Sequence, residues 1–238
     1  MTNWFETWFD DNYLRLYHHR NSKDAKEQVQ LILATLHPEK DQRILDLACG
    51  EGRHCVLFHN KGYRIVGMDL SDELIKSGKT KHPDIELHKG DMRQIKGTYD
   101  IILSLFTSFG YFDKDDDNKT VIQSIAHALH PNGLFWIDFL NPGYIKKNLV
   151  PGNEIILEDG TKVSEKRYIK ENSIIKEIHF EGPISVSTYQ ERVKLYTKED
   201  IEQMMRQSGI IPLDSFGDYK GSSWSPVSSR TIVYGRKE

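Results

Sequence analysis

A small-residue turn between an apolar run and a helix-like segment holds the residues best suited to bind a ligand. Residues 44–53 read ILDLACGEGR, with Ala48, Gly50 and Gly52 as the small positions. Small residues let a backbone approach a bound molecule closely, and the start of the following helix offers free N–H groups. Seventeen residues after Gly52, the next apolar run ends in Asp69, whose carboxylate can accept hydrogen bonds from both ribose hydroxyls. The spacing therefore predicts a nucleoside site.

Charge around this turn discriminates between nucleotide cofactors. Asp46 and Glu51 lie beside the turn and would repel a pyrophosphate placed between them. Cys55 replaces the third glycine of the Gly-x-Gly-x-x-Gly pattern of NAD and FAD sites, and no Lys-Ser/Thr pair of an ATP-type phosphate loop follows. S-adenosylmethionine carries an ammonium and a sulfonium and no phosphate, so it suits these carboxylates. Arg53 either binds the carboxylate of that cofactor or faces solvent. A nicotinamide-dependent oxidoreductase that uses the same turn is an alternative.

Strand-like and helix-like segments alternate around these residues. Short apolar runs predict strands over residues 43–48, 64–69, 85–89, 99–105 and 133–140. Apolar residues at helical spacing predict helices over residues 53–60, 71–81 and around 121–129, with a turn at Pro131-Asn132-Gly133. Strands that alternate with helices indicate a parallel sheet covered on both faces, with the ligand site at the carboxyl ends of the strands.

Two amphipathic helices are predicted before the first strand. Aromatic residues at three- and four-residue spacings predict a helix over residues 4–20. A second helix is predicted over residues 23–36, and His37-Pro38 ends it. Tyr17 lies on the first helix, where its hydroxyl can bond a cofactor or its ring can pack in the core.

The alternation stops after Pro142. Residues 154–196 show strand-like patterns separated by turn signals at Asp159-Gly160 and Glu171-Asn172, which predicts an antiparallel meander. Thr197 then begins a helix that runs to Gln207, and two strands follow over residues 211–216 and 231–235. We therefore expect three segments. Residues 1–142 form the N-terminal helices and the main part of a cofactor-binding domain, residues 143–196 an inserted meander, and residues 197–238 the remainder of the domain.

Several motifs in order resemble those of the class I S-adenosylmethionine-dependent methyltransferases. ILDLACGEGRHCVLFHNKGYRIVGMDLS is similar to the glycine-rich motif and the acidic strand end of that family, and GDMRQI to the segment after its third strand. YDIILSLFTSFGYF and LHPNGLFWIDFLNP are similar to its fourth- and fifth-strand regions. The resemblance implies an α/β fold with a seven-stranded, doubly wound, mostly parallel sheet in the order 3-2-1-4-5-7-6, the last strand antiparallel.

The resemblance also implies roles for particular residues. Asp46 and Gly50 match positions that hold the methionine end of the cofactor, and Gly52 matches a position of close chain approach. Asp69 matches the ribose acid and Asp91 the acid near the adenine amino group. The remaining expected contacts are Tyr17, Ala48, Arg53, Leu70, Met92, Leu105 and Phe106.

The residues that act on the methyl acceptor are less defined. Tyr111 and Asn141 follow the fourth and fifth strands, where an acceptor would sit, and Asp138 and His179 are further candidates. The predicted function is methyl transfer to nitrogen or oxygen of a small molecule, with tRNA methylation as an alternative. The meander serves as an acceptor lid or as the surface of a homodimer.

Composition sets outer limits on the protein class. The chain has 238 residues, 38% of them hydrophobic, with 32 basic and 35 acidic side chains. A net charge of −3 argues against nucleic acid as a partner, and no apolar run is long enough to span a membrane. Two cysteines cannot form a disulfide framework, the histidines show no metal-binding spacing, and no signal peptide is recognised. These features predict a cytoplasmic protein without a metal.

Overall fold

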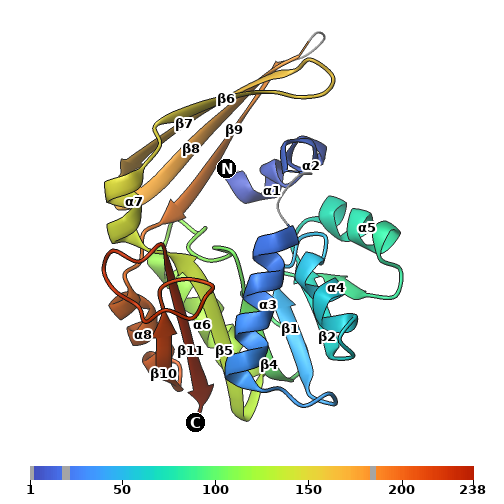
Figure 1. The fold of residues 1–238 in the computed structure, drawn as a ribbon, viewed down its shortest axis with the longest axis vertical. Helices are drawn as coiled ribbons and strands as arrows, with labels where there is room; N and C mark the ends of the chain where they lie inside the picture. Colours follow the sequence, from blue (N-terminus) through green and yellow to red (C-terminus); the bar gives the residue numbers. More distant parts are fainter. Residues whose placement is uncertain (1–2, 18–21, 183–185) are drawn as a thin grey trace.

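Two β-sheets organise the part of the chain that the structure describes, a computed structural model of residues 3–17, 22–182 and 186–238 (Figure 1). The larger sheet has seven strands in the order β10-β11-β5-β4-β1-β2-β3. These are β1 Arg43–Leu47, β2 Arg64–Asp69, β3 Glu86–Lys89, β4 Tyr99–Ser104, β5 Leu129–Leu140, β10 Ile210–Phe216 and β11 Arg230–Lys237. Strands β1 to β5 pair in parallel, and β11 runs antiparallel to both β5 and β10. The predicted strand order is confirmed.

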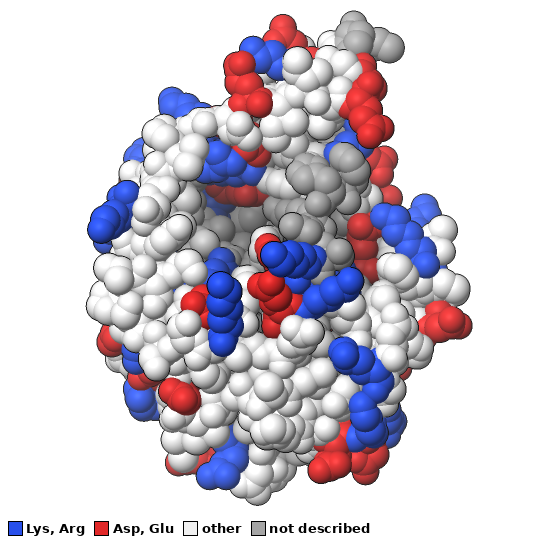
Figure 2. Space-filling view, in the orientation of Figure 1, with Lys and Arg blue, Asp and Glu red and all other residues white. Residues whose placement is uncertain are grey.

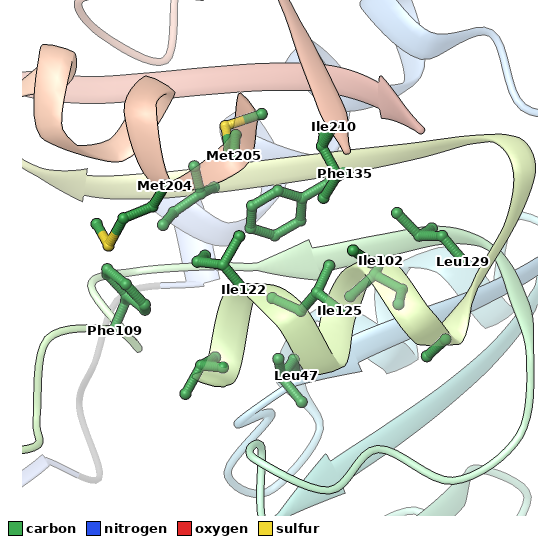
Figure 3. Close-up of a cluster of buried hydrophobic side chains, with 14 of the residues drawn as sticks. Leu47, Ile102, Phe109, Ile122, Ile125, Leu129, Phe135, Met204, Met205 and Ile210 are labelled. Atoms are coloured by element: carbon green, nitrogen blue, oxygen red, sulfur yellow. The ribbon is translucent and has the colours of Figure 1, made fainter. Parts of the chain in front are cut away.

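Successive residues of the central strands point to opposite faces of this sheet, and both faces are buried. Ile44, Ile101 and Trp136 belong to one hydrophobic cluster, whereas their neighbours Leu45 and Ile102 belong to another. The first cluster packs beneath α3 (Ser22–Leu36), α4 (Arg53–His59) and α5 (Asp72–Lys81). The second packs beneath α6 (Asp115–Ala128) and α8 (Lys198–Gln207), as Figure 3 shows. The continuous apolar runs of the sequence reflect this burial on two sides.

The N-terminal region forms two short helices where one helix over residues 4–20 was predicted. Helix α1 spans Trp4–Trp8 and α2 spans Asp11–Tyr17, with Phe9 in a non-helical conformation between them. The Asp10 carboxylate accepts hydrogen bonds from the backbone N–H groups of Asn12 (2.8 Å) and Tyr13 (3.2 Å), so it competes with helix continuation and starts α2. Residues 18–20 of the predicted helix lie outside the described residues.

The segment after β5 contains a helix that the sequence analysis did not predict. Helix α7 spans Pro142–Asn148 and begins with a proline at its first position. The Asn141 side chain caps it by accepting a hydrogen bond from the Gly143 N–H at 3.0 Å. Only then does the chain enter the predicted antiparallel meander.

The meander is a separate four-stranded sheet that projects from the main sheet (Figure 1). Its strands are β6 Gly152–Ile156, β7 Lys162–Lys170, β8 Ser173–Glu181 and β9 Val186–Lys194. Glu171 and Asn172 both have positive φ, 49° and 53°, as the tight turn between β7 and β8 requires. Residues 183–185 lie outside the described residues. Thr197 and Asp200 form the capping box that begins α8 and returns the chain to the main sheet.

Within these described ranges, no helix has both the length and the apolar character needed to cross a membrane.

Candidate active site

A cavity of about 370 Å³ opens at the carboxyl ends of β1, β2 and β4. Eleven of the twelve residues expected to bind a cofactor line it, and the exception is Gly52. The eleven are Tyr17, Asp46, Ala48, Gly50, Arg53, Asp69, Leu70, Asp91, Met92, Leu105 and Phe106. The acceptor candidate Tyr111 also lies on its wall. The fold therefore brings together residues that are up to about 90 positions apart in the sequence.

The turn between β1 and α4 owes its shape to three residues with positive φ. The φ angles are 57° at Ala48, 60° at Gly50 and 82° at Gly52. Gly52 does not line the cavity, because its Cα faces β3, where an added Cβ would lie 3.0 Å from a Leu87 methyl group. Gly52 therefore permits the turn and the packing beneath it, and it acts on the cavity only indirectly.

Asp69 is held at the tip of β2 by two backbone donors. The Gly50 N–H donates to Oδ2 at 2.8 Å, and the Ser71 N–H donates to Oδ1 at 2.9 Å. Burial raises the pKa of Asp69, although the bonds from Ser71 and Gly50 oppose that shift. Each carboxylate oxygen keeps a further lone pair for a ligand, as binding to a diol requires.

Asp46 is the most deeply buried carboxylate of the cavity, at 1% exposed. Burial raises its pKa to about 7, against the lowering effects of a Cys55 thiol at 3.6 Å from Oδ2 and of the Arg53 charge, and the neighbouring Asp69 raises it further. A carboxylate in this setting gains from a cationic ligand group, because such a group offsets the cost of burying the charge.

The other acids of the cavity have partners within the protein. Both oxygens of Asp91 accept hydrogen bonds from Arg93; these bonds outweigh burial and lower the pKa of Asp91. Glu51 accepts from Ser77 and from the Lys81 ammonium, both at 2.5 Å. The acidic character of the turn, which was predicted for Asp46 and Glu51 together, therefore rests on Asp46.

A second cavity of about 250 Å³ adjoins the first on the side of the meander. The two share a wall of four aromatic side chains, Phe9, Tyr13, Phe106 and Tyr111. The second cavity is completed by Trp4, Thr107, Leu140, Arg167, Ile174, Lys176, Glu191, Val193 and Arg230. Its walls therefore come from the N-terminal helices, the tips of the main sheet and strands β7, β8 and β9.

Glu191 is the one carboxylate that lines this second cavity among the described residues. Its Oε1 accepts hydrogen bonds from the Trp8 indole at 2.7 Å and from the Tyr17 hydroxyl at 3.2 Å. The Lys176 ammonium bonds the same Tyr17 hydroxyl and lies 2.5 Å from Glu165. Tyr17 thus lines the first cavity, while its hydroxyl bonds two residues that line the second cavity.

The structure does not bring Asn141, Asp138 or His179 to either cavity. Asn141 caps α7, and its NH₂ group donates to the carbonyls of Ser225 and Ser228. His179 bonds Thr188 within the meander at 3.0 Å. Both side chains therefore bond groups within the fold outside the two cavities.

Asp138 bonds the backbone of Phe106, one of the four aromatic residues that the two cavities share. Its Oδ2 accepts from the Phe106 N–H at 3.0 Å, and its Oδ1 accepts from Arg230 Nε at 2.7 Å. Phe106 and Thr107 both have positive φ, 54° and 70°, which is unusual for residues other than glycine. Asp138 and Arg230 therefore hold a strained loop in place, and Asp138 does not contact the space where a substrate would bind.

Four polar residues of the second cavity were not predicted from the sequence: Glu191, Lys176, Arg167 and Arg230. Arg230 is the first residue of β11, where no periodic pattern gives its direction. The other three lie on strands of the meander with many polar residues, a pattern that does not separate a cavity-facing side chain from a solvent-facing one. For these three residues, the packing of the meander against the N-terminal helices makes that distinction.

The donor and acceptor groups of the first cavity fit S-adenosylmethionine. The buried Asp46 carboxylate suits the cationic portion of this cofactor, and Asp69 at the adjacent strand tip suits its ribose hydroxyls. The apolar recess formed by Met92, Leu70 and Phe112 suits its base. The fold and this site are similar to those of class I S-adenosylmethionine-dependent methyltransferases.

Comparison with known proteins agrees with this class. Residues 44–133, less than half of the chain, match the model of a family described as a methyltransferase domain. The structure is similar to that of the CcbJ methyltransferase from Streptomyces caelestis, with a TM-score of 0.81, 16% identity and 98% of each chain covered.

Two similar relatives are sugar N,N-dimethyltransferases. The chain is 25% identical over 210 residues to dTDP-3-amino-3,6-dideoxy-alpha-D-glucopyranose N,N-dimethyltransferase from Streptomyces fradiae, with 82% of this chain and 81% of the relative aligned. It is 27% identical over 144 residues to dTDP-3-amino-3,4,6-trideoxy-alpha-D-glucopyranose N,N-dimethyltransferase from Streptomyces venezuelae. That second alignment spans 58% of this chain and 60% of the relative.

Proposed function

We propose that this protein transfers the methyl group of S-adenosylmethionine to an amino nitrogen of a small molecule held in the second cavity. The observation that carries the proposal is the aromatic wall shared by two adjoining cavities, one suited to the cofactor and the other containing a positioned carboxylate. Aromatic rings favour cationic groups near their faces, which suits a sulfonium on one side and a methylated ammonium on the other. The names of the two relatives support nitrogen as the acceptor atom.

The cofactor, when bound, supplies an electrophilic methyl group on a sulfonium. The residues of this chain then have to orient the acceptor, exclude water and receive a proton. The aromatic wall does the first two, and holding reactants in line can lower a barrier by roughly 7–11 kcal/mol in favourable cases. An ammonium must lose a proton before its nitrogen can attack, and Glu191 is the described carboxylate placed to accept it.

The nucleic-acid alternative finds no support on the face in Figure 2, where Lys and Arg side chains are interspersed with Asp and Glu and do not form one continuous basic area. The second cavity is also small for a polymer, at about 250 Å³. The homodimer through the meander and the cytoplasmic location stay predictions.

A methyl-donor assay over a panel of small amines tests the proposal. We expect formation of S-adenosylhomocysteine with an amino compound, and a product whose mass rises by one or two methyl groups. Matched alcohols that lack the amine should not turn over. Turnover of the alcohols alone would contradict nitrogen as the acceptor atom.

Glu191→Gln tests the proton acceptor. The amide oxygen still accepts from Trp8 and Tyr17, but it cannot take a proton, so we expect kcat at neutral pH to fall at least tenfold. The exposed Glu181→Gln, on strand β8 of the same sheet, is the matched control and should leave kcat unchanged. An unaltered pH–rate profile in Glu191→Gln would exclude Glu191 as the base.

A further inference from the structure

His54 is a buried histidine on the wall of the cofactor cavity to which the sequence analysis gave no role. It is the second residue of α4, is 4% exposed, and its Nδ1 lies 3.8 Å from Oδ2 of Asp46. Burial lowers its pKa to about 3, and the charge of Arg53 adds to that shift. The ring is therefore neutral near pH 7, with one nitrogen that carries a hydrogen and one that carries a lone pair.

A chain of hydrogen bonds behind the cavity determines which ring nitrogen of His54 carries the hydrogen. It starts at Asp138, which is 1% exposed and accepts from Arg230, Phe106 and Tyr219. A carboxylate that faces Arg230 accepts hydrogen bonds and does not donate them. The side chain of Gln28 faces Oδ2 of Asp138 at 3.4 Å, so its NH₂ group is the end that points there.

The carbonyl end of Gln28 must then face the histidine. Oε1 of Gln28 lies 2.5 Å from Nε2 of His54. A carbonyl oxygen only accepts, so Nε2 carries the hydrogen and Nδ1 carries the lone pair. Gln28 is itself 2% exposed, which keeps water from replacing either bond. Asp138 thereby sets the tautomer of His54 through Gln28, which lies between them in the chain of bonds.

This tautomer leaves two hydrogen-bond acceptors next to each other at the cavity wall. Nδ1 of His54 and Oδ2 of Asp46 face one another at a distance too long for a shared proton, and within the described residues no donor bonds to Nδ1. When Asp46 is ionised, two buried acceptors side by side favour a ligand group that brings several donors and a positive charge. A primary ammonium has three donors and no acceptor.

We propose that His54 binds the ammonium group of the cofactor through Nδ1, alongside Asp46, and that Gln28 and Asp138 are positioning residues that hold its tautomer. The inference rests on the proposed function in one respect, namely that the cofactor is an amino-acid nucleoside. It assigns a second ligand to that group and explains why a glutamine is buried between a histidine and an aspartate.

Binding calorimetry with two probes tests the assignment. S-adenosylhomocysteine carries the ammonium, whereas 5′-methylthioadenosine has the same nucleoside without the amino-acid end. In His54→Phe we expect about tenfold or greater loss of affinity for S-adenosylhomocysteine and little change for 5′-methylthioadenosine, as the loss of one bond to a charged group predicts. His59→Phe, exposed on the same helix, is the matched control and should bind both probes as the unsubstituted protein does.

The outcomes separate this inference from the proposed function. If the unsubstituted protein binds neither probe, the cofactor assignment fails. If it binds both, but His54→Phe weakens them equally or not at all, the role of His54 fails and the cofactor assignment stands.

Nitrogen NMR of the histidine rings gives an independent readout. We expect His54 to stay in the Nε2–H tautomer between pH 5.5 and 8, and to become a mixture of tautomers in Gln28→Met, which keeps the side-chain length and removes the amide. An Nδ1–H tautomer in the unsubstituted protein would overturn the assignment.

Discussion

Two buried acids face the cofactor cavity from neighbouring strands, and their surroundings differ. Asp69 ends β2 and is bonded by two backbone N–H groups, whereas Asp46 lies within β1 with a thiol and a histidine beside it. Spacing along the sequence predicted where both would lie, because each belongs to a strand that ends at the same edge of the sheet. It could not predict His54 or Gln28, since a histidine on an amphipathic helix gives the same pattern whether it is buried or exposed.

The ribose assignment makes a direct prediction for Asp69. Asp69→Ala removes the acceptor of two hydroxyl bonds and the partner of the Gly50 N–H, so affinity for S-adenosylhomocysteine should fall at least tenfold. Isothermal titration measures this. Asp84→Ala, at an exposed position before β3, is the control and should bind normally. Equal affinities in the two variants would contradict the assignment.

Cofactor binding should depend on pH through Asp46. Its pKa of about 7 means that the carboxyl is largely protonated at pH 5.5 in the cofactor-free protein, whereas a cationic ligand favours the ionised form. Affinity for S-adenosylhomocysteine should therefore rise by about tenfold from pH 5.5 to 7, with release of a proton on binding. The groups that face Asp46 are Arg53, His54, Cys55 and Asp69, and of these His54 stays neutral in that range.

Asp46→Asn provides the test, because it removes the titrating group and keeps the shape. We expect weaker binding whose pH dependence between 5.5 and 7 is nearly flat, and calorimetry in two buffers of different ionisation enthalpy should show no proton release. A slope as steep as in the unsubstituted protein would assign the titration to another group.

At the level of elements, long apolar runs and capped helices were predictable, and short interruptions were not. The strands of the main sheet and α8 follow from apolar periodicity and from the Thr197 cap, which are local signals. The break at Phe9 between α1 and α2 depends on one Asp10 side chain, and α7 has only two turns, too few for a periodic pattern. The meander was predictable because its turn residues are separated by alternating strands.

Gly52 combines a positive φ with a close approach to Leu87, and substitutions can measure the cost of these two features separately. Gly52→Ala would place a Cβ 3.0 Å from Leu87 at a φ of 82°, whereas Gly62→Ala would meet nothing within 4 Å at a φ of 79°. We expect a loss in the free energy of unfolding of about 1 kcal/mol for Gly62→Ala and about 2 kcal/mol or more for Gly52→Ala. Urea unfolding measures both, and equal losses would show that the Leu87 contact is unimportant.

Across the whole molecule, the N-terminal helices and the meander form one unit above the cavities. Trp8 and Leu16 are fully buried against Val163, Ile178 and Phe180 of the meander, and Trp8 bonds Glu191 across 183 positions. Figure 1 shows α1 and α2 between the meander and α5. A local sequence pattern does not indicate contacts between residues so far apart in the chain. The acceptor cavity was therefore not predictable from the sequence, whereas the cofactor cavity was.

The predicted homodimer makes a testable claim about the free edge of the meander. Ile156 on β6 is 76% exposed, at the edge opposite the one that packs on α1. We expect a dimer in sedimentation velocity experiments and a monomer for Ile156→Glu. Ile211→Glu, on the edge strand of the main sheet and 43% exposed, is the control and should remain dimeric. A monomer at every concentration of the unsubstituted protein would disprove the dimer.

The placement of the two chain ends has a practical consequence for labelling and immobilisation. Trp4 lies on the acceptor cavity and its indole bonds the Tyr111 carbonyl at 3.3 Å, while β11 ends at the far side of the main sheet (Figure 1). We expect a purification tag or a surface linker placed ahead of Trp4 to hinder access to the second cavity, which Trp4 lines. The same attachment after Glu238 should leave access to the second cavity unchanged. A comparison of turnover between the two fusions would therefore measure how far access to this cavity limits the reaction.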